Sequence, residues 1–308
     1  MELRLGAMNF GKRTSARDAE SILDAALERG ITHVDTANAY NGGESERIVG
    51  AWAKRRRGQV TLATKVGFGQ AAGKPEGLSR ARVLAACDES LGRLGVDAVD
   101  LYYLHVPDHV TPIEETIDAL AELFRAQKIR AWGLSNYASW EALLAMQAAE
   151  RAGLPRPAAS QQLYNLLIRQ LDLEYFRFAR RFDLHTTVYN PLAGGMLARR
   201  HAPDGSTTQG SRFDKNKLYL GRYWHDASFE RVEALARVAE GAGLSLVELA
   251  YAWLAGRPGV GSILVGPGSV AHLEAACAAV ERRVPDDARA AIDALHVEWM
   301  GTESSYAR

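Results

Sequence analysis

Four residues of types that can hold or transfer protons lie at or just after the ends of apolar segments. Asp35 ends "ITHVD", Lys65 lies near the end of "TLATKV", and His105 follows "VDLYYL". Tyr40 lies in the loop after Asp35. Singly, such an aspartate is often a cap, and such a histidine is often a structural core residue. A lysine, however, is seldom buried without a partner. Because the four occur in one pattern, we interpret them as a common catalytic site.

The chemistry that these residues could perform together is the reduction of a carbonyl group. A tyrosine hydroxyl has a reference pKa of about 10. An ammonium group about 4 Å away stabilises the phenolate by roughly 4 kcal/mol at an effective dielectric constant near 20, or up to about three pKa units. We therefore expect Lys65 to lower the pKa of Tyr40. Asp35 would balance the charge of Lys65, and His105 would donate a hydrogen bond to the carbonyl oxygen. Tyr40 would then protonate that oxygen while a hydride reaches the carbon.

Strand-like segments and helical patterns alternate along nearly the whole chain. Strands are predicted at residues 3–7, 32–36, 60–65, 99–105, 129–134, 158–161, 185–189 and 262–266. Such alternation predicts a parallel sheet covered by helices, and eight repeats favour a closed (β/α)8 TIM barrel over an open sheet. The active site of this barrel lies at the C-terminal ends of its strands, where Asp35, Lys65 and His105 are expected to meet. We expect one barrel domain over residues 1–308.

The connection after the seventh strand is the longest in the predicted barrel. Residues 193–227 are rich in Gly, Arg and Tyr, and two helical patterns follow them. A loop of this length in a compact domain is usually functional or disordered.

Two helix starts carry clear capping signals. Thr111 is predicted to be the N-cap of one helix, with Pro112 at its first helical position. Ser245 and Glu248 form a capping-box pattern at the start of another.

Composition excludes several classes of protein. The chain has 308 residues, 47% of them hydrophobic, and a formal net charge of zero, so no general attraction to nucleic acid or an anionic membrane is expected. Cys87 and Cys277 have no ligand spacing, and no disulfide framework or metal site is predicted. No signal peptide, membrane-spanning segment or Rossmann glycine motif is recognised. These features predict a soluble, cytoplasmic protein.

Several linked motifs resemble those of the aldo-keto reductase superfamily. They are "GITHVDTANAYNGGESERIVG", "LATKVG", "VDLYYLHVPD", "IRAWGLSNY" and "YNPLAGGML", in order from about Leu5 to Val280. The resemblance implies an (α/β)8 barrel that reduces aldehydes and ketones with a nicotinamide cofactor. By motif, the family's catalytic tetrad falls on Asp35, Tyr40, Lys65 and His105, with Tyr40 as the proton donor.

Further segments, including "LGAMNFGKR", "LYNLLIRQLDLEYF" and "RYW", are similar to the aflatoxin-aldehyde reductase subgroup. This similarity implies NADPH as cofactor, dialdehydes or succinic semialdehyde as substrates, and a homodimer as the assembly common in that subgroup. The substrate-binding residues that it implies are Met8, Tyr40, His105, Tyr219, Arg222 and Arg308.

The same motifs imply the cofactor site. Its residues are Ser135, Asn136, Gln161, Tyr189, Asn190, Pro191, Leu192, Gly194, Gly195, Leu197, Arg200, Arg212, Gly266, Gly268, Ser269 and His272. The run after the eighth strand, "VGPGSVAHLEAAC", departs from the family pattern. There His272 replaces an Arg or Gln and Ala276 an Asn, so NADH is an alternative to NADPH.

Two other functions are compatible with the barrel. One is a non-catalytic module similar to potassium-channel β subunits, which keep the barrel and the cofactor. The other is a metal-dependent hydrolase or isomerase that uses Asp35 and His105, although no His/Asp/Glu cluster with metal spacing supports it.

Overall fold

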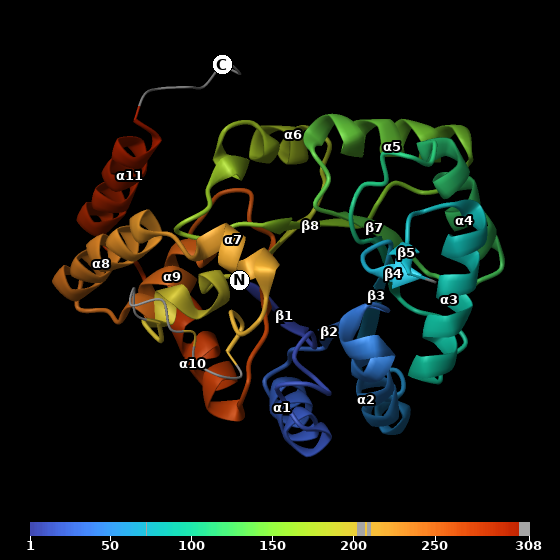
Figure 1. Ribbon diagram of the computed structural model, residues 1–308, viewed down its shortest axis with the longest axis horizontal. Coiled ribbons are helices and arrows are strands. Elements are labelled where there is room, and N and C mark those ends of the chain that lie inside the picture. The colour runs from blue at the N-terminus through green and yellow to red at the C-terminus, as the bar shows by residue number, and fades with distance from the viewer. Residues whose placement is uncertain (72, 202–206, 208–210, 302–308) are drawn as a thin grey trace.

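Eight parallel strands close into a barrel in the computed structural model, which describes residues 1–71, 73–201, 207 and 211–301 (Figure 1). Around the barrel the order is β1-β10-β9-β8-β7-β6-β3-β2. The strands are β1 (Glu2–Gly6), β2 (His33–Asp35), β3 (Thr61–Val66), β6 (Leu101–Leu104), β7 (Trp132–Ser135), β8 (Ala159–Leu163), β9 (Thr186–Tyr189) and β10 (Ser262–Val265). All eight predicted strands are present, and the predicted (β/α)8 fold is confirmed.

Helices lie around the outside of the barrel and cover its strands (Figure 1). Those that alternate with the strands are α1 (Ala16–Glu28), α2 (Glu44–Ala53), α3 (Arg80–Leu94), α4 (Ile113–Arg125), α5 (Ser139–Arg151), α6 (Tyr175–Arg181), α9 (Leu246–Ala255) and α10 (Val270–Val280). Their buried faces and the outward faces of the strands form the main apolar core. Inside the barrel, Tyr103 packs in a smaller cluster with Ala63, Leu101 and Ala159. The barrel is thus a filled scaffold whose strand ends can carry a site.

The connection after β9 contains more structure than the sequence pattern indicated. The 3-10 helix η4 (Ala193–Ala198) and the helix α7 (Lys217–Tyr223) lie inside the stretch that was predicted as one long loop. The two helical patterns expected after it are α8 (Asp226–Gly241) and α9. α8 packs against the C-terminal helix α11 (Asp286–Met300), at the side of the barrel (Figure 1).

Shorter elements complete the described part of the fold. They are the 3-10 helices η1 (Tyr40–Gly43), η2 (Lys54–Arg56) and η3 (Gln170–Asp172) and the antiparallel pair β4 (Gln70–Ala71) and β5 (Lys74–Pro75).

One of the two predicted capping signals is confirmed and the other is wrong. Ser245 Oγ accepts the Glu248 N–H at 3.2 Å, and Glu248 Oε2 accepts the Ser245 N–H at 2.8 Å. At the start of α4, however, Pro112 is the N-cap, and Thr111 lies outside the helix. The Thr111 hydroxyl instead donates to Asp108 at 2.7 Å, which holds it in the preceding turn.

Within the described residues, no single helix is long and apolar enough to cross a membrane. α8 and α9 reach that length and composition only together, and the break between them bends the pair by 85°.

Candidate active site

The four residues proposed as a catalytic group converge at one end of the barrel. Lys65 is fully buried, and its Nζ forms an ion pair with Asp35 and donates to the Thr36 carbonyl at 2.8 Å. The same Nζ lies 5.2 Å from the centre of the Tyr40 ring. Tyr40 meets the His105 ring edge-on, with 5.7 Å between ring centres. A continuous set of contacts therefore joins the buried ion pair to Tyr40 and His105.

Strand register and one short helix position these side chains. Asp35 is the last residue of β2, Lys65 is near the end of β3, and His105 directly follows β6. Tyr40 begins η1, which Asn41 fixes to the neighbouring loop. The Asn41 side chain donates to the carbonyls of Met8 at 3.1 Å and Phe10 at 2.7 Å.

The pKa of Tyr40 differs from the sequence-based prediction. Burial raises this pKa above its usual value, and the charge of Asp35 raises it further. The ammonium of Lys65 lies over the Tyr40 ring and is already paired with Asp35. The expected lowering of the Tyr40 pKa by Lys65 is therefore wrong for this form of the protein, in which Tyr40 is a neutral phenol at neutral pH.

Burial also sets the protonation state of His105. It lowers the pKa of His105 well below the usual range, and the charge of Lys65 acts in the same direction. A neutral imidazole can donate one hydrogen bond and accept another. The Nδ1 atom of His105 has no hydrogen-bond partner among the described residues.

A group of amides lies beside the four residues, on the next strands around the barrel. Gln161 Nε2 donates to Asp35 Oδ2 at 2.9 Å, so it is the second group that holds this carboxylate. Asn136 Nδ2 donates to the His105 carbonyl at 2.9 Å, and Asn136 Oδ1 accepts the Tyr189 hydroxyl at 2.7 Å. This link between Gln161 and Asp35 had no sequence signal, because it depends on the closure of the barrel.

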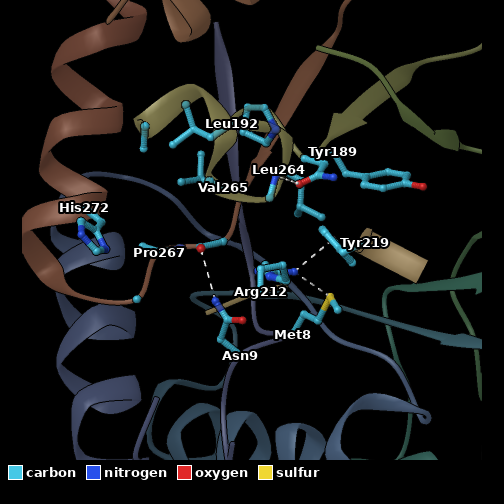
Figure 2. A pocket seen from close by; sticks show the side chains of 18 of the residues that line it. Met8, Asn9, Tyr189, Leu192, Arg212, Tyr219, Leu264, Val265, Pro267 and His272 are labelled. Carbon is cyan, nitrogen blue, oxygen red and sulfur yellow. Dashed lines mark hydrogen bonds between the residues drawn. The ribbon is translucent and has the colours of Figure 1, made fainter. Parts of the chain in front are cut away.

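A cleft of about 1330 Å³ runs from this group toward the start of α10. In Figure 2, Tyr189 lies on one side of the view and His272 on the other, with Arg212 between them. The predicted site residues that line the cleft are Met8, Asp35, Tyr40, His105, Ser135, Asn136, Gln161, Tyr189, Asn190, Pro191, Leu192, Gly194, Gly195, Arg200, Arg212, Tyr219, Arg222, Gly266, Gly268 and His272.

Three of the predicted site residues that the structure describes do not line the cleft. Lys65 lies behind Tyr40 and Asp35, where it is fully buried. Leu197 was expected to contact a cofactor, but its side chain is buried in the apolar core. Ser269 is the N-cap of α10, where its hydroxyl accepts the His272 N–H at 3.3 Å. Arg308 lies outside the described residues.

The connection after β9 forms one wall of the cleft, and its tight turn has a backbone conformation that favours glycine. Gly194 and Gly195 have φ values of 72° and 109°, in the region that favours glycine. Asn190 Oδ1 accepts the Gly194 N–H at 2.9 Å and holds the turn. A Cβ atom at Gly194 would lie 2.8 Å from the Tyr219 ring, so this turn can approach its neighbours only without a side chain.

Basic side chains lie along the rest of the cleft. Arg212 Nη1 contacts Met8 Sδ at 3.1 Å and the Tyr219 hydroxyl at 3.2 Å (Figure 2). Arg200 Nη2 lies 2.7 Å from His272 Nε2, so His272 accepts this bond as a neutral ring. The Arg200 guanidinium therefore lies beside a neutral ring, and its positive charge favours an anionic ligand.

Sequence reasoning missed other residues of the cleft. Phe68 lines it and contacts the His105 ring, with 5.0 Å between ring centres, although Phe68 remains 43% exposed. Asn9 also lines it and donates to the Gly266 carbonyl at 3.5 Å. Phe68 follows the strand that carries Lys65, and a large aromatic residue at a strand exit is the signal that could have revealed it.

In the described part of the chain, no group of three or more His, Cys, Asp or Glu residues could hold a metal ion.

Comparison with known proteins agrees with this fold. A family model described as the Aldo/keto reductase family matches residues 2–297. The Homo sapiens protein named aldo-keto reductase family 7 member A3 is 35% identical over 96% of this chain and 92% of its own length. Aflatoxin B1 aldehyde reductase member 2 of Homo sapiens is 35% identical over 96% of this chain and 85% of its own. An Oryza sativa subsp. japonica protein named probable voltage-gated potassium channel subunit beta is 32% identical over 86% of this chain and 83% of its own.

The barrel and its site thus define an oxidoreductase that uses a nicotinamide cofactor. The chain belongs to the aldo/keto reductase family.

The cleft fits such a cofactor. One end of the cleft carries the Asn136 and Gln161 side chains beside Tyr189. The other end carries Arg200 and His272. The glycine turn after β9 allows close approach of a bulky anionic ligand to the backbone.

Proposed function

We propose that this protein reduces an aldehyde to an alcohol with NADPH, and that Tyr40 donates the proton. The observation that carries the proposal is the contact of Tyr40 with both Lys65 and His105 in the wall of a cleft that fits a nicotinamide cofactor. The relatives named aflatoxin B1 aldehyde reductase support the aldehyde as the substrate class.

The chain's own residues would divide the work as follows. Bound NADPH would supply the hydride to the carbonyl carbon. The neutral imidazole of His105 would donate a hydrogen bond to the carbonyl oxygen and orient it beside the Tyr40 hydroxyl. As charge develops on that oxygen, Tyr40 would transfer its proton. The Lys65 ammonium would stabilise the phenolate left behind, and Asp35 would keep Lys65 charged.

We propose that Asn136 and Gln161 hold the amide of the nicotinamide and that the ring of Tyr189 packs against it. Arg200, His272 and Arg212 are the side chains best placed to favour NADPH over NADH, because the two arginines are positively charged, His272 contacts Arg200, and all three line the same cleft. NADH remains the alternative cofactor.

A carboxylate on the substrate would bind Arg222. This residue lines the cleft, and its guanidinium lies 5.9 Å from the centre of the Tyr219 ring. It forms no ion pair within the described residues, so its hydrogen-bonding edges can take a carboxylate. Succinic semialdehyde is the expected substrate, and Arg308 is proposed as a second carboxylate ligand.

Oxidation of NADPH and NADH at 340 nm across a panel of aldehydes tests the proposed function. We expect steady turnover with NADPH and slower turnover with NADH. If a cofactor binds but no aldehyde or ketone is reduced, the protein is a binding module of the potassium-channel β type and the proposal is wrong.

Arg222→Ala tests the carboxylate contact. Because each charge-assisted hydrogen bond contributes about 1.5–3 kcal/mol, the variant should raise KM for succinic semialdehyde at least about tenfold. An uncharged aldehyde of similar size should be much less affected. An equal rise in KM for both substrates would show that Arg222 stabilises the loop or contacts the cofactor, and does not bind the carboxylate.

A further inference from the structure

A second cavity of about 570 Å³ shares a wall with the cleft. Among the described residues, only Arg222 lines both the cleft and the second cavity. On the side of the cleft, the Arg222 guanidinium lies 5.9 Å from the centre of the Tyr219 ring. The proposed carboxylate ligand Arg222 therefore lies between the two spaces.

The second cavity combines basic and apolar walls. Its basic residues are Arg222, His225 and Arg231, and Leu163, Leu167 and Ile168 supply apolar surface. α7 and the start of α8 form the basic side, and the apolar residues come from the end of β8 and the segment after it. Such a lining suits a ligand with a hydrocarbon chain and a negatively charged end.

The two arginines are held by aromatic rings and not by carboxylates. The Arg231 guanidinium lies 5.2 Å from the centre of the Trp299 ring on α11, as Arg222 lies over Tyr219. Within the described residues neither arginine forms an ion pair. A guanidinium stacked on a ring keeps its in-plane N–H groups available, and these are the groups that bind a carboxylate in a fork.

From this arrangement we infer that the second cavity binds the far end of long substrates, namely unbranched aldehydes with a carboxylate at the other end of the chain. The aldehyde lies at Tyr40 and His105, the hydrocarbon chain passes Arg222, and the carboxylate binds Arg231. A four-carbon semialdehyde ends at Arg222 and does not enter the second cavity. This inference rests on the proposed reductase function and extends it to a class of substrate.

The test compares aldehyde acids of four, six, eight and ten carbons with neutral aldehydes of the same lengths. For the wild-type protein, kcat/KM should favour the eight-carbon acid over its neutral counterpart by at least about tenfold. Arg231→Ala should remove about tenfold of kcat/KM for the eight- and ten-carbon acids and leave the four-carbon acid within about twofold. Arg222→Ala should impair all the acids.

Two further variants separate the charge of Arg231 from its packing. Ser228→Glu places a negative charge in the wall of the same cavity and should weaken the long acids as Arg231→Ala does, whereas Ser228→Gln should not. Arg237→Ala, an exposed arginine on the same helix outside the cavity, is the matched control and should change nothing.

Direct binding keeps the test independent of turnover. The eight-carbon hydroxy acid, which is the expected product, is titrated into the cofactor-free protein by calorimetry, and Arg231→Ala should raise its Kd about tenfold. If no aldehyde is reduced, the proposed function is wrong, and this titration still decides the second cavity. Equal effects of Arg231→Ala on short and long acids, or no effect on either, would overturn the inference.

Discussion

The Tyr40 side chain has two unlike neighbours, a neutral imidazole at its edge and an ammonium over its ring. Neither neighbour ionises Tyr40 in the absence of ligands, because burial raises the pKa of its hydroxyl. A phenol that keeps its proton until negative charge appears nearby is suited to act as an acid late in the reaction.

Tyr40→Phe should therefore remove most turnover and leave cofactor binding nearly unchanged. Loss of a general acid typically lowers rates by about 10²–10⁴-fold, and the substitution keeps the aromatic ring against His105 and Lys65. Steady-state kinetics measure the loss of turnover. Titration with NADPH, followed by protein fluorescence, measures cofactor binding. A kcat near that of the wild type would exclude Tyr40 as the proton donor.

The convergence of these four residues was predictable from the sequence, but their electrostatics were not. Asp35, Lys65 and His105 are recognisable because strand patterns place them at strand ends. The pKa of Tyr40 depends on burial by many residues and on the pairing of Lys65 with Asp35, and a pairwise estimate between Tyr40 and Lys65 includes neither.

At the scale of elements, the regular strand and helix repeats were predictable and the long connection was not. Strand positions follow from short apolar runs, each bounded by a helical pattern. In contrast, η4 contains Gly194 and Gly195 with positive φ, and α7 has only seven residues. Neither gives a clear helical period, although both line the cleft through the glycine turn and Arg222.

The fit between neighbouring strands around Lys65 gives a second prediction. Gly133 on β7 faces the ring of Tyr103 on β6, which lies 5.8 Å from Lys65 Nζ. A Cβ atom at Gly133 would lie 2.6 Å from that ring and 2.8 Å from the Ala159 carbonyl oxygen. The position of the Tyr103 ring near Lys65 therefore requires glycine at residue 133.

Gly133→Ala should lower the free energy of unfolding by about 1–3 kcal/mol, as overpacking of a core does, and should also reduce kcat by moving Tyr103 against Lys65. Urea unfolding and steady-state kinetics measure the two effects. Gly92→Ala is the control, because Gly92 lies in α3 with no atom within 4 Å of its added Cβ, and alanine there should raise stability by about 0.5–1 kcal/mol. Equal stability of the two variants would show that the barrel interior can adjust to the methyl group.

At the scale of the whole molecule, one ionic cluster connects the segment after β8 to the C-terminal helix. Asp172 accepts hydrogen bonds from the Tyr164 hydroxyl at 2.6 Å, Arg169 Nε at 2.8 Å and Arg257 Nη2 at 2.9 Å. Arg169 is only 6% exposed and also pairs with Asp293 on α11 at 2.8 Å. The cluster therefore holds α11 to the barrel, and α11 carries the ring under Arg231.

The charge of Asp172 should consequently make stability depend on pH. Although burial acts to raise it, the pKa of Asp172 is lowered by the hydrogen bond from Tyr164 and by the charges of Arg169 and Arg257. A carboxyl group whose pKa is lower in the folded state stabilises the fold above its unfolded pKa of about 3.9, and this contribution is lost as pH falls through the folded-state pKa.

Asp172→Asn should lower the free energy of unfolding by about 3 kcal/mol at pH 7, because it leaves two partly buried arginines without their shared carboxylate. The difference between wild type and variant should shrink as the pH falls below about 4, since acid removes the same charge from the wild type. Urea unfolding at pH 7 and at lower pH measures both. Glu20→Gln, which breaks an exposed ion pair with Arg55, is the control and should have little effect. A difference between wild type and Asp172→Asn that stays constant with pH would show that the shape of residue 172, and not its charge, stabilises this side of the barrel.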